Sequence, residues 1–376
     1  MQENTFKKLH ESYIETALFG RYINHKMIAP LLANLDSNFE VQEIGRSVKN
    51  YPIYSISFGY GSKKVLMWSQ MHGNESTTTK SIFDLLNTFS SKPNAANSIL
   101  DNCRIVMIPI LNPDGADAYT RMNANAIDLN RDAQDLTQPE SKVLRAIFDK
   151  FKPDYCFNLH GQRTIFSAGS ENYPATVSFL APSQDVDRTV TKTRKSAMEL
   201  IVAMNRHLQK QIPYQVGIYD DSFNLNCVGD TFQYLGIPTV LFEAGHFKHD
   251  YQRETVRRFI YESLFVALDY IASNDVSGEF YQDYFNIPKN EKRFYDVIIR
   301  NASQGDIAIQ YQERLIDGTI HFLPKIEKIS NLNAYHSHMS INASGYEVFG
   351  ANNTAIKEGS EIDFVIVNNE KFSLFS

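Results

Sequence analysis

Three apolar stretches of this sequence have the composition of buried β-strands, and each leads within a few residues to a histidine or a glutamate. In chain order they are Lys64–Gln70 before His72 and Glu75, Tyr155–Leu159 before His160, and Pro238–Phe242 before Glu243. Helical stretches separate them, and strands that alternate with helices form a mainly parallel sheet. Because parallel strands bring their carboxyl ends to one edge of a sheet, the sequence predicts an α/β fold that gathers these four side chains there.

The remaining pattern predicts a mixed, mostly parallel sheet that helices cover on both faces. Further strands are expected at residues 39–48, 53–58 and 103–110, and helices at 5–36 (one or two), 76–90, 138–151, 187–210 and 252–272. We expect the first two strands to form a hairpin beside the strand that leads to His72. Residues 111–115 are predicted to turn, and residues 214–226 to form a polar loop.

The pattern changes near residue 273, because the later strands alternate with no convincing helix. The Asp317-Gly318 pair predicts a hairpin turn in this part. The sequence therefore predicts three parts: a helical segment at 1–36 packed on the main domain, the α/β domain at 37–275, and a small all-β domain at 276–376.

Composition narrows the classes of partner. The chain has 376 residues, 43% of them hydrophobic, and carries 37 basic against 43 acidic residues for a net charge of -6. This balance gives no electrostatic reason to expect nucleic acid or an anionic membrane as partner. The N-terminus lacks the apolar run of a secretory signal, so a cytoplasmic location is expected. Cys103, Cys156 and Cys227 are far apart and odd in number, which disfavours a disulfide scaffold.

The residue types at the strand ends are ligands that zinc accepts. Two imidazoles and one carboxylate form the three-ligand set of a catalytic zinc, which leaves a fourth position for water. His72 and Glu75 alone are also typical of a turn histidine and a surface glutamate, and it is the later His160 and Glu243 that favour a metal. No His-Glu-x-x-His motif occurs, because Ile14 stands where His10-Glu11 requires the second histidine, and this excludes a thermolysin-like site.

The ordered set of motifs resembles the zinc metallocarboxypeptidase family over roughly residues 50 to 250. The matching motifs are His72-Gly-Asn-Glu75, Asn112-Pro-Asp-Gly115, Arg121, Asp128-Leu-Asn130-Arg131, Leu159-His160 and Phe242-Glu243. The resemblance implies one zinc per chain and a peptide or amino-acid conjugate as substrate. It implies these roles: His72, Glu75 and His160 hold zinc, Arg121 faces the scissile carbonyl, Asn130 and Arg131 bind the terminal carboxylate, and Glu243 is the general base.

The sequence departs from the family at the tyrosine that closes over the substrate. The family spacing before the catalytic glutamate falls here at Asp221-Ser222-Phe223, so Tyr219 serves only if the loop shifts. The alternative is a loop tyrosine packed on its neighbours. The loss of this group would weaken substrate capture more than chemistry, because the metal and the base remain.

Several alternatives stay open at this point. A zinc N-deacylase or amidase of the aspartoacylase type has a similar site, and a catalytically silent binding protein can keep the same fold. Arg121 and Arg131 are also compatible with ordinary ion pairs. The pairs His246/His249 and His336/His338 have metal-compatible spacing, and we favour solvent-facing or loop positions for both. The β domain is a lid, a dimer contact or a targeting piece, and we favour a place near the cleft that admits only short substrates.

Overall fold

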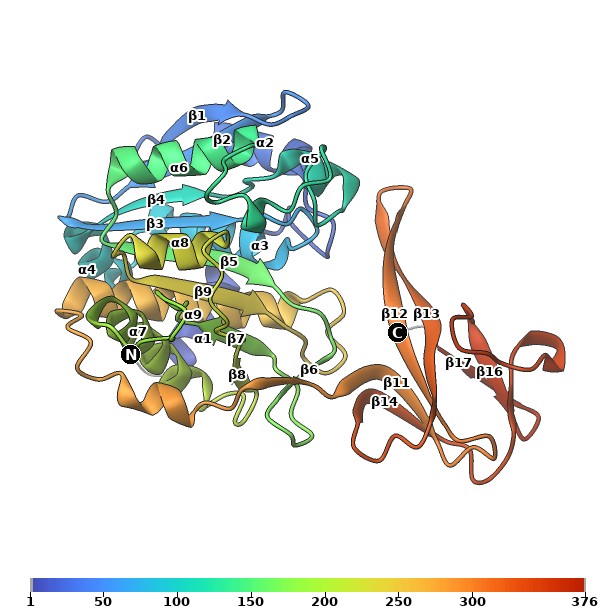
Figure 1. The fold of residues 1–376 in the computed structure, drawn as a ribbon. Helices are drawn as coiled ribbons and strands as arrows, with labels where there is room; N and C mark the ends of the chain where they lie inside the picture. Colours follow the sequence, from blue (N-terminus) through green and yellow to red (C-terminus); the bar gives the residue numbers. More distant parts are fainter. Residues whose placement is uncertain (1–2, 375–376) are drawn as a thin grey trace.

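The computed structural model describes residues 3–374 and is built around one eight-stranded mixed sheet (Figure 1). The strand order is β1-β2-β4-β3-β5-β9-β7-β8. The strands are β1 Glu40–Arg46, β2 Pro52–Phe58, β3 Lys63–Ser69, β4 Cys103–Ile108, β5 Tyr155–Gly161, β7 Val177–Leu180, β8 Val216–Ile218 and β9 Thr239–Ala244. The four central strands β4, β3, β5 and β9 run parallel, and the flanking pairs bring in antiparallel neighbours. The predicted α/β fold with a mixed, mostly parallel sheet is confirmed.

Helices cover both faces because the central strands are apolar on both sides. In β3, Val65 and Met67 pack into one core while Leu66 and Trp68 pack into the other. The first core takes α1 Glu3–Tyr13, α2 His25–Ala33, α3 Thr77–Ser91, α4 Asn94–Asn102, α7 Lys192–Leu208 and α9 Glu254–Ser273. The second takes α6 Pro139–Phe151 and α8 Val228–Tyr234. A short helix, α5 Pro113–Ala118, follows β4 at the edge of the sheet.

The structure corrects some of the predicted elements. The β1–β2 hairpin forms, but it pairs with β4 and not with the strand that leads to His72. The reason is that α3 and α4 return the chain so that β4 lies parallel to β3 on the hairpin side. The sequence prediction also missed α4, α5 and α8, which are short and contain glycine, asparagine or aspartate, and β8, which is three residues long within the predicted polar loop.

The C-terminal part is built from β-strands, as predicted. A four-stranded sheet has the order β13-β12-β11-β14, formed by β11 Phe294–Arg300, β12 Asp306–Ile316, β13 Thr319–Ser330 and β14 His336–Asn342. A second sheet contains β15 Val348–Phe349, β16 Phe364–Val367 and β17 Glu370–Ser373, and β10 Asn290–Lys292 pairs with β6 Phe166–Ala168. Asp317 and Gly318, at φ 49° and 78°, form the predicted hairpin turn. The remaining elements are the short 3-10 helices η1 Leu129–Arg131, η2 Gln282–Asn286 and η3 Ala351–Asn353.

The C-terminal sheet lies on the side to which the central parallel strands point (Figure 1). Glu313 of β12 pairs with Arg21 at 2.9 Å and accepts a hydrogen bond from the Tyr119 hydroxyl at 2.5 Å. Gln310 donates to Thr164 at 2.6 Å. These contacts join β12 to the N-terminal segment and to the loops after α5 and β5, while the division at residue 276 stays a prediction.

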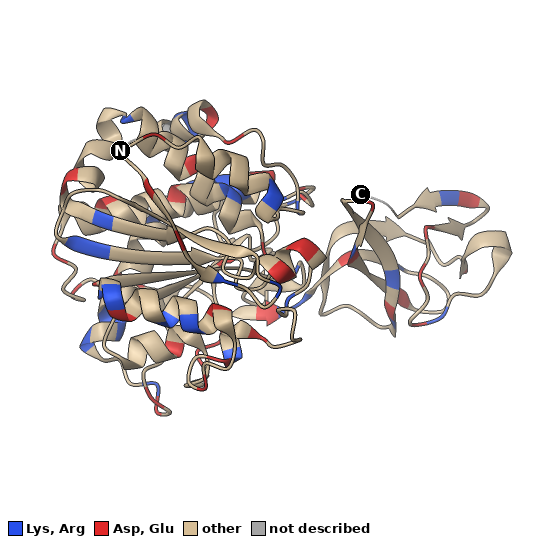
Figure 2. Cartoon of the chain, turned by 90° about the horizontal axis from the view of Figure 1, so that it is seen from above, with Lys and Arg blue, Asp and Glu red and all other residues tan. Residues whose placement is uncertain are grey.

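The charged residues are mixed along the chain, in keeping with its 37 basic and 43 acidic residues. Basic and acidic positions are interspersed over the helices and strands (Figure 2). Among the described residues, none of the helices combines the length and apolarity that a bilayer crossing requires. Cys103, Cys156 and Cys227 are all free thiols.

A buried ionic network fastens the N-terminal segment to α3 and α9. Asp84 of α3 is fully buried and accepts hydrogen bonds from the Arg257 guanidinium at 2.6 and 2.7 Å, and from the Glu15 N–H at 2.7 Å. His10 lies 3.1 Å from the same carboxylate. Burial opposes ionisation of Asp84, but the hydrogen bonds from His10 and Arg257 outweigh it and hold its pKa below the ordinary value.

Replacing Asp84 with alanine should lower the free energy of unfolding by about 3–5 kcal/mol, because the buried Arg257 guanidinium loses its counter-ion. Chemical denaturation followed by circular dichroism measures this change. Asp101→Ala is the control, since Asp101 is exposed on α4 and should change stability by less than ~0.5 kcal/mol. Equal unfolding midpoints for the two variants would contradict the role of this network.

Candidate active site

The turn after β3 is held in place by the segment that follows β4. Asn112 caps α5 by accepting the Gly115 N–H at 2.9 Å, and its amide donates to the Met71 carbonyl at 3.2 Å. A Cβ on Gly73 would lie 1.9 Å from the carbonyl carbon of Gly115, so only glycine fits at this crossing. The Asn112-Pro-Asp-Gly115 motif therefore supports the turn that presents His72.

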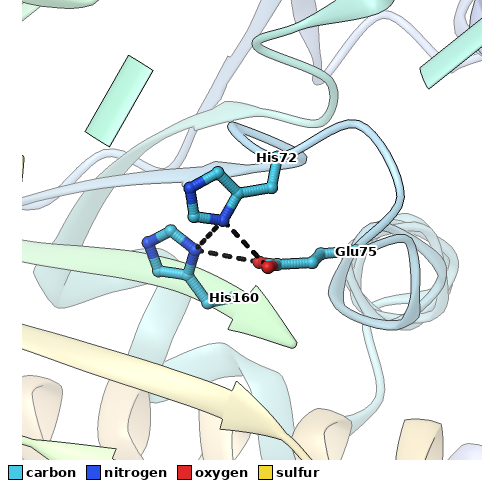
Figure 3. A group of neighbouring side chains, drawn as sticks. All are labelled: His72, Glu75 and His160. Carbon is cyan, nitrogen blue, oxygen red and sulfur yellow. Dashed lines mark hydrogen bonds and ion pairs between the residues drawn. The ribbon is translucent and has the colours of Figure 1, made fainter. Parts of the chain in front are cut away.

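His72, Glu75 and His160 converge at the carboxyl edge of the sheet (Figure 3). The two Nδ1 atoms of the histidines lie 3.1 Å apart. Glu75 Oε1 lies 2.9 Å from Nδ1 of His72, and Oε2 lies 2.9 Å from Nδ1 of His160. Within residues 3–374, this is the one group of three or more His, Cys, Asp or Glu ligand atoms gathered within 4.8 Å.

The hydrogen bonding around His72 indicates which of its ring nitrogens carries the proton. Nε2 of His72 lies 3.1 Å from the Asp128 carboxylate, which only accepts, so the ring proton of neutral His72 belongs on Nε2. Its Nδ1 then turns a lone pair toward Nδ1 of His160 and the carboxylate of Glu75. Nη1 of Arg121 also lies 3.2 Å from this Nδ1, and two imidazoles with one carboxylate are a donor set for zinc. The partner carboxylate behind His72 is the arrangement that orients metal-bound histidines.

The pKa shifts within the group follow from burial and from the close charges. Burial opposes charge on His72, but Glu75 and Asp128 outweigh it and raise the pKa of His72 above its ordinary value. Burial also opposes charge on Glu75, and the two histidines outweigh it and lower the pKa of Glu75. Burial lowers the pKa of His160, whose Nε2 has no partner within the described part of the chain. Glu75 is therefore a carboxylate at neutral pH and His160 a neutral imidazole.

Arg121 lies beside His72, Glu75 and His160, the three side chains that are called the metal group below. Its guanidinium contacts Asp128 Oδ2 at 3.0 and 3.1 Å and reaches within 3.5 Å of Glu75. Arg121 thus forms the ion pair that sequence analysis left as an alternative, and the same pair holds it at the metal group. Its side chain keeps 42% exposure, so its remaining N–H groups are open to a ligand.

A cavity of about 330 Å³ opens from the metal group toward Asn130 and Arg131. Asn130 is fixed by its side-chain oxygen, which accepts the Val228 N–H at 3.1 Å. Arg131 is exposed and donates only to the Asn130 carbonyl, at 2.7 Å, and among the described residues no carboxylate pairs with it. This end of the cavity therefore presents a guanidinium without an anionic partner, together with Asp230, whose pKa burial raises to about 7.

Glu243 lies on the same cavity, next to His160. The two residues are direct neighbours in the parallel pairing of β5 with β9. Glu243 is 8% exposed, and its Oε2 has no hydrogen-bond partner among the described residues. Burial, and then the charge of Glu75, raise the pKa of Glu243 well above its ordinary value. A carboxyl group that is buried, unpaired and beside a metal group has the properties of a proton-transfer residue.

Tyr219 follows β8 and lines the same cavity. Its ring packs against Phe166 with 5.4 Å between ring centroids, and burial raises the pKa of its hydroxyl to about 12. Tyr219 therefore packs on a neighbour, as expected of an ordinary loop tyrosine, and it also lines the cavity, as a tyrosine that covers the substrate must.

The other histidine pairs do not gather a third ligand in the described part of the chain. The expectation of solvent-facing or loop positions is wrong for two of the four, His336 and His338, while His246 lies in a loop but is buried. His246 is 2% exposed, and His336 and His338 lie within β14 and contact the carbonyls of Ser170 and Thr164 at 3.0 and 2.8 Å. The reason is that the C-terminal sheet covers this region, and the His246 and His338 rings meet at 4.2 Å.

Sequence reasoning missed two supporting residues. The role of Asp128 behind His72 had a signal, because it begins the Asp128-Leu-Asn130-Arg131 motif. Arg253 had no such signal. It is 2% exposed and donates to the Ala244 carbonyl, next to Glu243, and to the Gln162 carbonyl, two residues after His160. Arg253 therefore ties together the two strand ends that carry these residues.

Comparisons with known proteins agree with this geometry. The family model described as zinc carboxypeptidase matches residues 25–234, more than half of the chain. A carboxypeptidase 2 from Trichophyton rubrum is 31% identical over 101 residues, covering 26% of this chain and 19% of that protein. The carboxypeptidase SOL1 from Arabidopsis thaliana is 28% identical over 137 residues, covering 31% of this chain and 28% of that protein. The chain therefore matches less than a third of the length of these relatives.

Solved structures show the same fold. Carboxypeptidase A from Helicoverpa armigera has a TM-score of 0.54 at 16% identity, covering 72% of this chain and 80% of that one. A metallo-carboxypeptidase from Burkholderia cenocepacia has a TM-score of 0.52 at 17% identity, covering 66% and 70% of the two chains. At these identities the likeness concerns the fold.

Replacing His160 with alanine should lower zinc affinity by more than ~100-fold, since even partners behind the ligands are worth 10–100-fold. Elemental analysis after dialysis against a weak chelator should find about one zinc per wild-type chain and little in the variant. His321→Ala, at an exposed position of β13, is the control and should keep its metal. Full zinc occupancy in the His160 variant would contradict the assignment of this ligand.

Proposed function

The chain belongs to the zinc carboxypeptidase family, and on this premise we propose that it is a zinc-dependent hydrolase that removes the C-terminal residue of peptides or peptide-like conjugates. The observation that supports this most directly is the convergence of His72, Glu75 and His160 within 4.8 Å. The cavity that opens from them also contains Arg131 and Glu243. Metal ligands, a base and an anion-binding group thus share one space.

The three ligands would hold one zinc ion per chain. Zinc bound there polarises the scissile carbonyl and lowers the pKa of a water toward ~7. The protein must then supply proton transfer, stabilisation of the oxyanion and positioning of the substrate.

Glu243 is proposed as the general base. Its unpartnered Oε2 is free to accept a proton from the attacking water and to pass it to the leaving amine. The pairing of β5 with β9 fixes this carboxyl beside His160.

Arg121 is proposed to donate hydrogen bonds to the oxyanion that develops on the scissile carbonyl. The contact with Asp128 holds the guanidinium in place before the substrate arrives, so little reorganisation is needed during the reaction. Loss of one such donor in other hydrolases lowers the rate by roughly 10²–10³-fold.

Asn130 and Arg131 are proposed to bind the terminal carboxylate of the substrate. The planar guanidinium of Arg131 has no anionic partner among the described residues, and it can grip a carboxylate with two parallel hydrogen bonds. Tyr219, on the wall of the same cavity, is proposed to cover the bound residue.

The alternative of a zinc N-deacylase of the aspartoacylase type shares the metal and the base. The two functions differ in the bond that is cleaved: a carboxypeptidase releases the C-terminal residue of a peptide, whereas a deacylase removes the acyl group of an N-acyl amino acid. Release of acetate from N-acetyl amino acids measures the deacylase activity directly. A catalytically silent binding protein is disfavoured because the three proposed ligands and Glu243 all stand in one site.

A blocked dipeptide with a free C-terminus should be hydrolysed with a kcat/KM about 10–100-fold above that of its C-terminal amide. A charge-assisted hydrogen bond is worth roughly 1.5–3 kcal/mol, which corresponds to this ratio. Release of the C-terminal residue, measured by chromatography, checks the prediction. Arg131→Gln should bring the two rates together, while Arg104→Gln, at an exposed position of β4, should leave the difference intact. Equal rates for acid and amide in the wild type would rule out carboxylate recognition.

Replacing Glu243 with glutamine should leave zinc bound and reduce kcat by at least ~10²-fold, because the isosteric amide cannot accept a proton. Zinc content and turnover are measured on the same preparation, so loss of metal and loss of the base are told apart. A variant that keeps both its zinc and full activity would show that another group is the base.

A further inference from the structure

Two cavities meet at the metal group. The first, the leaving-residue cavity, is the one of about 330 Å³ that contains Asn130 and Arg131. The second, the acyl-side cavity, has a volume of about 320 Å³ and contains neither. Both share five lining residues, which are Glu75, Arg121, Gly161, Gln162 and Arg163. Under the proposed function, the leaving residue occupies the first cavity, and the acyl part of the substrate must extend past Arg121 into the second.

The C-terminal sheet forms the outer wall of the acyl-side cavity. The wall comprises Asp296 of β11, residues 310–313 of β12 and Phe322 of β13. Tyr251 packs against Tyr311 and Phe322 with centroid distances of 5.1 and 5.4 Å, and these rings close one end. The acyl part therefore meets a surface that the C-terminal strands supply.

Basic groups on this cavity outnumber the acidic groups that could neutralise them. Of the four lining arginines, Arg21 pairs with Glu313 and Arg121 pairs with Asp128. The other two, Arg163 and Arg253, form no salt bridge among the described residues, and Glu313, whose charge attracts Arg253, is already paired with Arg21. Arg163 is exposed at the mouth that joins the two cavities, and Arg253 is 2% exposed.

Unpartnered polar atoms gather on the same cavity. Nε of Arg21, Nε of Arg253 and the side-chain oxygen of Gln310 are buried without a hydrogen-bond partner, as far as the structure describes the chain. All three residues line the acyl-side cavity. Buried polar groups are seldom left unsatisfied, so two N–H donors and one acceptor here indicate a polar ligand.

The carboxylates of the cavity are already occupied. Asp296 accepts from the Tyr251 hydroxyl at 3.0 Å and from the Tyr311 N–H at 2.7 Å, and burial raises its pKa to about 6. Glu313 is held by Arg21 and Tyr119. Glu75 belongs to the metal group. The charged groups of the acyl-side cavity that form no salt bridge are therefore the positive guanidinium groups of Arg163 and Arg253.

We propose that the acyl-side cavity selects substrates with an acidic residue immediately before the scissile bond, whose side-chain carboxylate is bound by Arg163 and Arg253. The aromatic end and the oxygen of Gln310 accommodate the rest of the acyl part. The C-terminal sheet is then part of the substrate-binding site and limits how far the acyl chain extends. This inference rests on the proposed carboxypeptidase function and adds the substrate class.

Arg163 is the position for the test, because it is exposed and no hydrogen bond or ion pair holds it within the described residues. Arg253 is unsuitable as the main variant, since it ties the Ala244 and Gln162 carbonyls and its loss endangers folding. Arg104→Gln is the matched control, an exposed arginine on β4 that lines neither cavity.

The experiment uses the full-length zinc enzyme and two substrates that differ in one group, acetyl-Glu-X and acetyl-Gln-X, where X is the best leaving residue. The glutamate substrate should show a kcat/KM about 10-fold higher at low ionic strength, and the ratio should shrink as salt is added. Arg163→Gln should bring the ratio of the two kcat/KM values close to one. Arg104→Gln should keep it. Equal kcat/KM for both substrates, or a ratio that survives Arg163→Gln, overturns the proposal while carboxypeptidase activity stands.

A binding measurement tests the inference independently of turnover. Acetyl-glutamate and acetyl-glutamine are the acyl products of the two substrates and differ in the same side-chain carboxylate. Calorimetric titration measures the Kd of each. We expect a Kd about 10-fold lower for acetyl-glutamate, with the difference lost in Arg163→Gln. Equal Kd values overturn the inference. Absence of hydrolysis of any substrate, together with the expected binding difference, overturns the proposed function and leaves this site supported.

Discussion

The candidate active site depends on one constraint, the approach of two imidazole nitrogens and one carboxylate to about 3 Å. The Nδ1 atoms of His72 and His160 and the carboxylate of Glu75 face one another, and Asp128 fixes the ring proton of His72 on the far nitrogen. Nη1 of Arg121 lies 3.2 Å from Nδ1 of His72, and two imidazoles with one carboxylate are also a donor set that suits a metal ion. The fold must therefore hold these groups rigidly enough that they cannot turn away from each other.

Rigidity comes from strand pairing and from hydrogen bonds to main-chain carbonyls. The β3–β5 and β5–β9 pairings fix the order of the three strand ends, and Arg253 donates to the carbonyls beside two of them. The turn after β3 begins at Gln70, which adopts a φ of 43° and donates to the Gly73 carbonyl at 2.8 Å. A non-glycine residue in this conformation is strained, and its surroundings must stabilise it, as is common at functional sites.

The parts of the site that could be predicted are those that follow from local sequence patterns. His72, Glu75, His160 and Glu243 each follow a strand with a clear apolar pattern, so their shared edge follows from parallel pairing alone. The sequence could not show that β4 separates the β1–β2 hairpin from β3, because strand order depends on how α3 and α4 pack. It could not reveal Arg253 or the burial of His246 either, since both result from contacts with distant strands.

The C-terminal sheet is coupled to the reaction centre through Glu313. This carboxylate holds Arg21 of the N-terminal segment and the hydroxyl of Tyr119, two residues before Arg121. Burial opposes ionisation of Glu313, but Arg21 and Arg253 outweigh it and lower its pKa, so it stays charged at neutral pH. The segment that carries Arg121 is therefore anchored on β12 as well as on Asp128. One strand of the C-terminal sheet lines the acyl-side cavity and also anchors the segment that carries Arg121, so the proposed substrate selection and the proposed oxyanion stabilisation depend on the same element.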